Sequence, residues 1–194
     1  KTAIDTAFEM QKGYALKLRK STCAQRLEAL ARFEKAFKAS YDKIYASAAA
    51  DFGKPEAEVD MAEIMIVLSE LSHIRKKLKK WMKPVSVSAS MTMLGTSSKI
   101  VTEPKGTSLV ISPWNYPFNL TFGPMMSAIA AGCTVIIKPS EMTPNMSKVI
   151  AEIVEEAFRP EEVSLFEGDA SVSSYLTSLP FDHIFFTGSP AVGK

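Results

Sequence analysis

The sequence predicts an α/β fold with a doubly wound parallel sheet. Helices are expected at the N-terminus of the chain, followed by a protruding β-hairpin. Three observations predict it. Apolar residues recur with a helical period through the first 83 residues, β-formers alternate with Ser and Thr between residues 85 and 105, and apolar strands alternate with helices from residue 106 onward. With 194 residues, 46% of them hydrophobic, the chain is long enough for one full domain.

Four helices are expected before residue 84. The first follows the helical period from Ile4 to Leu18. Thr22 and Gln25 form a capping box, which opens the second helix. The predicted apolar face of this second helix consists of Leu27, Leu30, Ala31, Phe33 and Phe37.

The third helix is expected from about Asp42 to Ala50, where Gly53 ends it, and Pro55 starts the fourth. The fourth helix is long and ends before Pro84, which cannot continue it. Its apolar residues repeat in steps of three and four, at Ile64, Val67, Leu71, Ile74, Leu78 and Trp81.

A basic run from Arg75 to Lys83 closes the fourth helix. Cations at this end complement the helix macrodipole, whereas a nucleic-acid surface would carry aromatic side chains for stacking. Over the whole chain, 23 Lys and Arg nearly balance 21 Asp and Glu, for a net charge of +2. We therefore favour a solvated helix end and expect no nucleic-acid partner.

Residues 85–105 predict a two-stranded hairpin with its turn near Gly95. The β-formers that alternate with Ser and Thr are Val85, Val87 and Ala89 before Leu94-Gly95, and Ile100 and Thr102 after it. An isolated hairpin is marginally stable in water, so its edges are expected to pair elsewhere, in another part of the protein or in another subunit.

Beyond Gly106 the strands have near-continuous apolar content and are separated by helices. The predicted strands are Thr107–Ser112, Thr134–Lys138, Val163–Phe166 and Ile184–Phe186, and the predicted helices are Pro117–Ala131, Pro144–Phe158 and Ser171–Ser178. This pattern indicates a Rossmann-like parallel sheet covered on both faces. Ligands of such sheets bind at the carboxyl ends of the strands, so the loops there are the places to look for chemistry.

The loop after Ile111 reads SPWNYPFN and holds Asn115 at the mouth of the sheet. An Asn amide in that position could donate to a developing oxyanion. The alternative is a residue that simply tolerates a turn conformation, which spacing alone favours.

The loop after Ile137 reads KPSEMTP, which places Lys138 close to Glu141 before a helix start. Such a pair could hold the ribose hydroxyls of a nucleotide. The alternative is a surface ion pair of little energetic value.

The loop after Phe186 contains two glycines that let a backbone approach a phosphate. Residues 188–194 match the first seven positions of the P-loop pattern, but the required Ser or Thr would be residue 195. Pro190 also removes one of the backbone donors that a phosphate cradle needs.

The cysteine and histidine residues predict neither a disulfide framework nor a metal site. Cys23 and Cys133 are far apart with no second thiol near either, which favours a reducing cytoplasm over a disulfide framework. His73 and His183 show no metal-ligand spacing, so no metal is expected. The longest mostly apolar run, 125–137, is too short for a membrane span, which needs about 20 residues.

Three motifs together resemble the N-terminal portion of NAD(P)-dependent aldehyde dehydrogenases, most closely the class 3 branch of fatty and aromatic aldehyde dehydrogenases. They are PWNYPFNL at 113–120, AIAAGCTVIIKPSE at 128–141 and FDHIFFTGSPAVGK at 181–194. Their order and spacing are those of the family, and the similarity extends more weakly over the whole chain.

The resemblance implies oxidation of aldehydes to carboxylic acids with NAD or NADP. It implies that residues 1–84 and 106–194 form the N-terminal part of the cofactor-binding domain, and that residues 85–105 form an oligomerisation hairpin. A cytoplasmic homo-oligomer, either a dimer or a tetramer, is therefore expected. The resemblance further implies that the catalytic domain is absent from this chain.

The resemblance also assigns individual residues. Asn115 matches the oxyanion donor, and Lys138 and Glu141 match the contacts to the adenosine ribose. The residues that match the loop and helix start facing the pyrophosphate are Gly188, Ser189, Val192 and Gly193. The residues that match cofactor wall contacts are Ile111, Trp114 and Phe186.

In the resembling family the nucleophilic Cys and the general-base Glu follow the cofactor glycines, which places both beyond Lys194. Cys133 starts a buried strand and is expected to behave as a small apolar residue, and Cys23 lies in a helix first turn. The segment alone is therefore expected to be inactive. Two alternatives stay open: a non-catalytic nucleotide-binding fragment and, with less support, a P-loop phosphotransferase.

Overall fold

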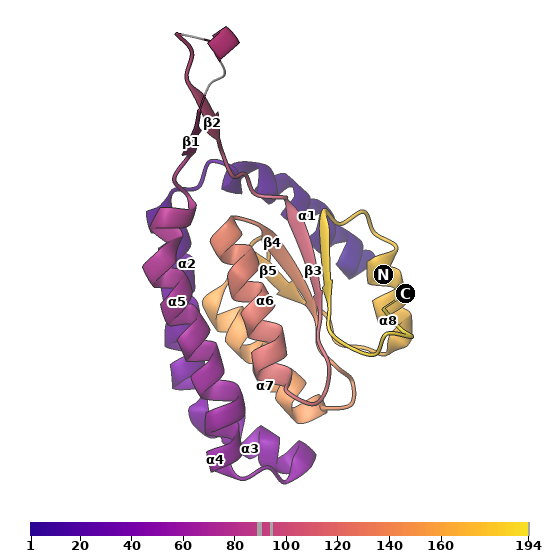
Figure 1. The fold of residues 1–194 in the computed structure, drawn as a ribbon. Helices are drawn as coiled ribbons and strands as arrows, with labels where there is room; N and C mark the ends of the chain where they lie inside the picture. Colours follow the sequence, from indigo (N-terminus) through magenta and orange to yellow (C-terminus); the bar gives the residue numbers. More distant parts are fainter. Residues whose placement is uncertain (89–90, 94, 194) are drawn as a thin grey trace.

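The computed structural model describes residues 1–88, 91–93 and 95–193. Its centre is a parallel sheet with the strand order β5-β4-β3-β6 (Figure 1). The strands are β3 (Thr107–Ile111), β4 (Thr134–Lys138), β5 (Val163–Leu165) and β6 (His183–Phe186). Each coincides within one residue at both ends with a predicted strand, which confirms the sequence-based assignment.

Helices cover both faces of this sheet (Figure 1). On one face lie α6 (Pro117–Ala131) and α7 (Pro144–Ala157), and on the other lie α1 (Thr2–Leu18) and α8 (Ala170–Thr177). The buried side chains of the strands divide between two apolar clusters, one under each pair of helices. Burial on both faces is the reason why the strands are apolar nearly throughout, and it confirms the doubly wound architecture.

Further helices pack outside α6 and α7. They are α2 (Cys23–Ala39), α3 (Tyr41–Phe52), α4 (Glu56–Val59) and α5 (Met65–Trp81). Thr22 and Gln25 cap the start of α2 as predicted, since the Thr22 hydroxyl accepts from Gln25 N and the Gln25 side chain accepts from Thr22 N. Gly53 ends α3 in the left-handed region, with φ at 67°.

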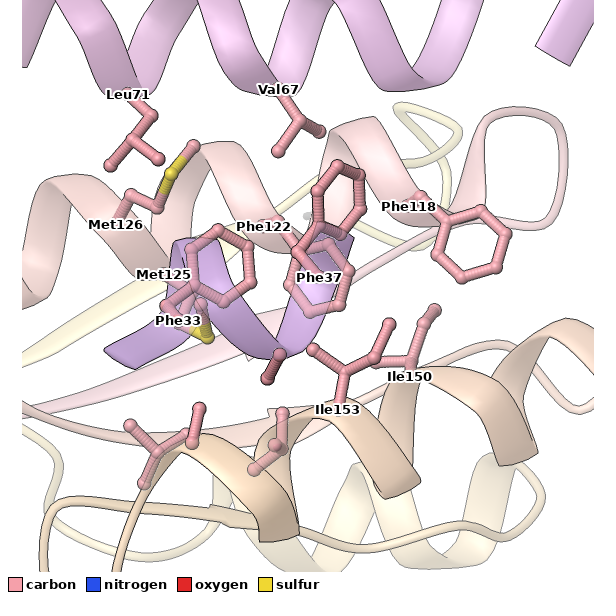
Figure 2. Packing of buried hydrophobic residues seen from close by; sticks show 14 of the residues in the cluster. Phe33, Phe37, Val67, Leu71, Phe118, Phe122, Met125, Met126, Ile150 and Ile153 are labelled. Carbon is pink, nitrogen blue, oxygen red and sulfur yellow. The ribbon is translucent and has the colours of Figure 1, made fainter. Parts of the chain in front are cut away.

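Aromatic rings join this outer layer to the sheet domain. Phe33 and Phe37 of α2 lie with their ring centroids 4.9 and 5.6 Å from that of Phe122 in α6, and all three side chains are buried (Figure 2). Burial of a large aromatic side chain of this kind contributes roughly 1.5–3 kcal/mol. The N-terminal helices are therefore part of the same packed body as the sheet.

Two residues of the predicted apolar faces are exposed. Ala31 follows Leu30 directly, so it is rotated about a quarter-turn away from the buried stripe through Leu30, Phe33 and Phe37. Trp81 lies in the last turn of α5 with 48% of its surface exposed. The predictions that these two side chains are buried were therefore wrong.

The predicted long helix from Pro55 is interrupted. Pro55 precedes the short helix α4, and a π-helical turn, Asp60–Ile64, separates α4 from α5. A π turn widens the helix and is frequently found at functional sites. Here Glu63 and Ile64 are both buried, and the Glu63 carboxylate lies against the start of α6.

The predicted hairpin forms from two short strands, β1 (Val85–Val87) and β2 (Ser98–Ile100). They pair antiparallel, extend away from the body and do not join the four-stranded sheet (Figure 1). Gly95, where the turn was expected, has φ at 92°, whereas Ala89 and Leu94 lie outside the described residues. Thr102 lies beyond β2, and both strands are exposed. The pairing of their edges with another part of the protein or another subunit stays a prediction.

Buried polar side chains fix the sheet against its neighbours. Gln11 of α1 donates to the Val135 and Pro160 carbonyls, both at 3.0 Å. Asp182 accepts from Thr107 N at 2.7 Å and from its hydroxyl at 2.9 Å, which ties the start of β6 to the start of β3. These hydrogen bonds hold α1 against β4 and the loop before β5, and they hold β6 beside β3.

Candidate functional site

The carboxyl ends of three strands lie in one row. Ile111 of β3 is in register with Lys138 of β4 on one side and with Phe186 of β6 on the other. The winding reverses at β3, because β4 and β5 lie on one side of it and β6 lies on the other. Ligands of open parallel sheets bind at such a reversal, so this edge is the candidate site.

Lys138 and Glu141 form an ion pair at this edge. The Lys138 side chain is only 4% exposed, and its ammonium donates to Glu141 Oε2 at 2.5 Å. The Glu141 side chain is 48% exposed. The hydrogen bond from Lys138 lowers the pKa of Glu141, so its carboxylate is ionised at neutral pH and presents an oxygen to solvent.

Asp169 is a charged residue near this pair that the sequence analysis missed. It caps the start of α8, where its carboxylate accepts from Ser171 N at 2.9 Å and from the Ser171 hydroxyl at 2.6 Å. These hydrogen bonds lower the pKa of Asp169, and Lys138 lowers it further. The loop after β5 was expected to carry chemistry, but no residue in it was singled out.

The glycine-containing loop folds back over the ring of Phe186. A Cβ atom added at Gly188 would collide with that ring, and one added at Gly193 would lie 3.2 Å from it. The Ser189 carbonyl accepts from both Val192 N and Gly193 N at 3.1 Å. The loop is a turn up to Gly193, with no helix start within the described residues, and Lys194 lies outside them.

Asn115 lies in the exposed loop between β3 and α6. Its backbone carbonyl accepts from Lys54 Nζ at 2.8 Å. Within the described ranges its side-chain amide makes no hydrogen bond, and so it is available to a ligand. The neighbouring Trp114 is 48% exposed and contacts the ring of Phe52 at 6.0 Å between centroids.

Glu63 is the second charged residue that sequence reasoning missed. Its side chain is fully buried beside the Asn115 loop, and its Oε2 accepts from Asn119 N at 2.8 Å. Burial raises the pKa of Glu63 to about 7, although the hydrogen bond from Asn119 and the nearby Lys54 oppose this shift. A signal existed in the sequence: Glu63 lies four residues before Val67, on the apolar stripe of the predicted helix.

Neither thiol lies at the candidate site. Cys133 is buried directly before β4, at the opposite end of the strand from Lys138, and Cys23 is the first residue of α2. Both positions were predicted. Within the described ranges, no three His, Cys, Asp or Glu side chains gather as a metal would require, and no helix is long and apolar enough to span a membrane.

The sequence pattern of the aldehyde dehydrogenase family matches residues 1–194. The chain belongs to this family. It is 43% identical over 169 residues to 4,4'-diaponeurosporen-aldehyde dehydrogenase of Staphylococcus aureus, and 39% identical over 152 residues to aldehyde dehydrogenase family 3 member H1 of Arabidopsis thaliana. The second relative confirms the expected likeness to class 3 members.

A solved structure of substrate-bound Staphylococcus aureus AldH has the same fold, with a TM-score of 0.95 and 39% identity. The match covers 98% of this chain and 42% of AldH. The two sequence relatives are covered over 37% and 31% of their lengths, with 87% and 78% of this chain aligned. The chain thus spans less than half the length of these aldehyde dehydrogenases.

The raised pKa of Glu63 predicts that the stability of the fold depends on pH. Its folded pKa of about 7 lies above its ordinary value of 4.5, so the stability it confers is fully present below pH 4.5 and is lost as the pH rises through 7. We expect the free energy of unfolding to fall between pH 4.5 and 8 by roughly 3 kcal/mol more in the wild type than in Glu63→Gln. Urea unfolding across this range measures the difference.

The exposed Glu56, in the adjacent helix α4, supplies the control for this experiment. Glu56→Gln should keep the pH dependence of the wild type. Parallel curves for the wild type and Glu63→Gln would show that Glu63 does not titrate in this range.

Proposed function

We propose that the polypeptide containing this chain oxidises aldehydes to carboxylic acids with NAD or NADP, and that residues 1–194 supply the N-terminal part of its cofactor-binding portion. The observation that carries the proposal is the row of Ile111, Lys138 and Phe186 at the switch point, with Glu141 paired to Lys138. Family membership supports the aldehyde as substrate.

The residues at this edge fit the adenosine half of a dinucleotide. The half-exposed Glu141 carboxylate accepts hydrogen bonds from ribose hydroxyls, and the buried Lys138 holds it in place. Trp114 and Phe186 supply apolar walls together with Ile111. The loop proposed to face the pyrophosphate consists of Gly188, Ser189, Val192 and Gly193. When bound, the nicotinamide ring supplies the hydride acceptor.

Asn115 is proposed to stabilise the oxyanion that forms when a nucleophile adds to the aldehyde carbonyl. Its amide has no partner within the described residues, and its backbone is held by Lys54. Because its backbone is held before the reaction, the amide needs less reorganisation to stabilise the developing charge.

The nucleophilic Cys and the general-base Glu are proposed to come from outside residues 1–194. Cys23 and Cys133 both lie away from the carboxyl edge, so neither thiol can attack an aldehyde held beside Asn115. The same observation favours the second candidate function, in which the segment by itself is a non-catalytic nucleotide-binding unit.

The hairpin of residues 85–105 is proposed to join subunits of a cytoplasmic dimer or tetramer. Its strands expose apolar side chains and unpaired edges, which favour association with a second chain. The exposed apolar residues in and next to the strands are Val85, Val87, Ile100 and Val101.

Substitution of Asn115 tests the proposed catalytic role. In the natural polypeptide, Asn115→Ala should lower kcat by roughly 10²- to 10³-fold, because one oxyanion donor is lost, and should leave the affinity for NAD unchanged. NADH formation with a saturating aldehyde measures kcat. Asn145→Ala, which removes an amide paired with Asp51, is the control. A kcat within threefold of the wild type, with chemistry rate-limiting, would reduce Asn115 to a turn residue.

Substitution of Glu141 tests cofactor binding. The 2′-phosphate of NADP adds about two negative charges beside this carboxylate. Glu141→Gln should therefore weaken the binding of NAD and raise the affinity for NADP relative to that for NAD. Calorimetric titration of both nucleotides gives the affinity ratio. Glu152→Gln is a matched control, because Glu152 also pairs with a lysine, Lys43, at an exposed position. An unchanged ratio in Glu141→Gln would remove this residue from the site.

A further inference from the structure

The helix that follows the Asn115 loop lacks a local cap. The residue that precedes α6, Tyr116, makes no capping hydrogen bond with its side chain, although the first backbone N–H groups of any helix need acceptors. The acceptor comes from Glu63, 56 residues before Asn119 in the chain, whose carboxylate accepts from Asn119 N at 2.8 Å. A negative charge is favoured at this end by the helix macrodipole.

A lysine is enclosed between this carboxylate and the loop. Lys54 Nζ donates to the Asn115 carbonyl at 2.8 Å and lies 3.8 Å from Glu63 Oε1. The same ammonium lies 4.7 Å from the ring centroid of Tyr116 and 5.0 Å from that of Phe52. Only 11% of the Lys54 side chain is exposed. The backbone of the loop is thus held by a cation with four partners.

Burial of Glu63 and Lys54 costs desolvation free energy that a purely structural role would not justify. Glu63 Oε1 is buried without a hydrogen bond within the described part of the chain, and replacement of a buried ion pair by apolar residues is often neutral or stabilising. The best-supported role of a buried ion pair is to select one conformation of the chain around it. Here the geometry specified is that of the segment which carries Asn115.

We propose that Lys54 and Glu63 are positioning residues that together hold the Asn115 loop so that its amide meets the oxyanion. The proposal rests on the proposed function of Asn115. Glu63 fixes the first turn of α6, Lys54 fixes the carbonyl of Asn115, and the ion pair couples the two. Because an oxyanion donor acts only within about 2.7–3.1 Å of the charged oxygen, a small shift of the loop backbone removes its effect.

The rate of the reaction should then depend on the charge of Glu63. The groups that face its carboxyl are Lys54 from the segment between α3 and α4, Glu58 from α4, and the N–H groups of Phe118 and Asn119 from α6. Protonation weakens the attraction for Lys54 and for the helix start. Since the pKa of Glu63 is raised to about 7, kcat should increase with pH through this value.

The first experiment removes the ammonium in the natural polypeptide. Lys54→Met should lower kcat roughly 10- to 100-fold and change the KM for NAD less than twofold, and Lys54→Arg should restore part of the loss. Combined with Asn115→Ala, Lys54→Met should cause little further loss, because Lys54 acts through Asn115. Lys43→Met is the control, since it also removes a lysine from an ion pair. Multiplicative effects of Lys54→Met and Asn115→Ala would overturn the proposal.

The second experiment removes the charge of Glu63 and keeps an acceptor for Asn119 N. Glu63→Gln should abolish the rise near pH 7 in the plot of kcat against pH, whereas Glu56→Gln should preserve this rise. An identical rise in Glu63→Gln and the wild type would show that Glu63 does not position the loop through its charge.

The third measurement separates this proposal from the proposed function. Hydrogen exchange of the backbone amides of residues 114–116 should be faster in Lys54→Met than in the wild type and unchanged in Lys43→Met. If the wild type forms no NADH with any aldehyde, the proposed function fails, while faster exchange still supports the clamp on the loop. Unchanged exchange in Lys54→Met would overturn the clamp, whether or not the enzyme is active.

Discussion

The parallel pairing of β3 with β4 and β6 determines where every loop of the candidate site lies. All five residues of β3 are buried, and its hydrogen bonds to β4 and β6 bring the ends of these three strands to one edge. The chain reverses its direction of winding at this strand, which in open parallel sheets is the position where ligands bind. Asn115, Lys138 and the glycine-containing loop therefore lie at the same edge, although they are far apart in the sequence.

Two buried charged side chains hold loops in place rather than add to the stability of the fold. Lys138 at the end of β4 and Glu63 in the π turn are both desolvated, and each is paired with a residue of opposite charge that is more exposed. Burial of an ion pair contributes little net stability. In both places the buried partner instead fixes a loop at the carboxyl edge: Lys138 orients Glu141, and Glu63 acts through Lys54 on the loop that carries Asn115.

The sheet domain could be predicted closely from the sequence, because its strands are short apolar runs bounded by Gly, Pro and polar residues. The positions of Asn115, Lys138 and Glu141 followed from the rule that loops at the carboxyl edge carry the ligand site. Glu63 could not be assigned a role in this way, because its partners, Asn119 and Lys54, are defined only by tertiary packing. The π turn was equally hidden, since a helical period carries no mark of one inserted residue.

The proposed cofactor site can be tested by a structure of the natural polypeptide with bound NAD. We expect a Glu141 carboxylate oxygen within hydrogen-bond distance of the adenosine ribose, with the pyrophosphate over Gly188 and Gly193. A basic pocket of about 440 Å³, lined by residues that include Arg26 and Arg32, lies at the other end of β4, near Cys133. Adenosine bound in that pocket, or anywhere else away from the carboxyl edge, would show that Lys138 and Glu141 do not form the cofactor site.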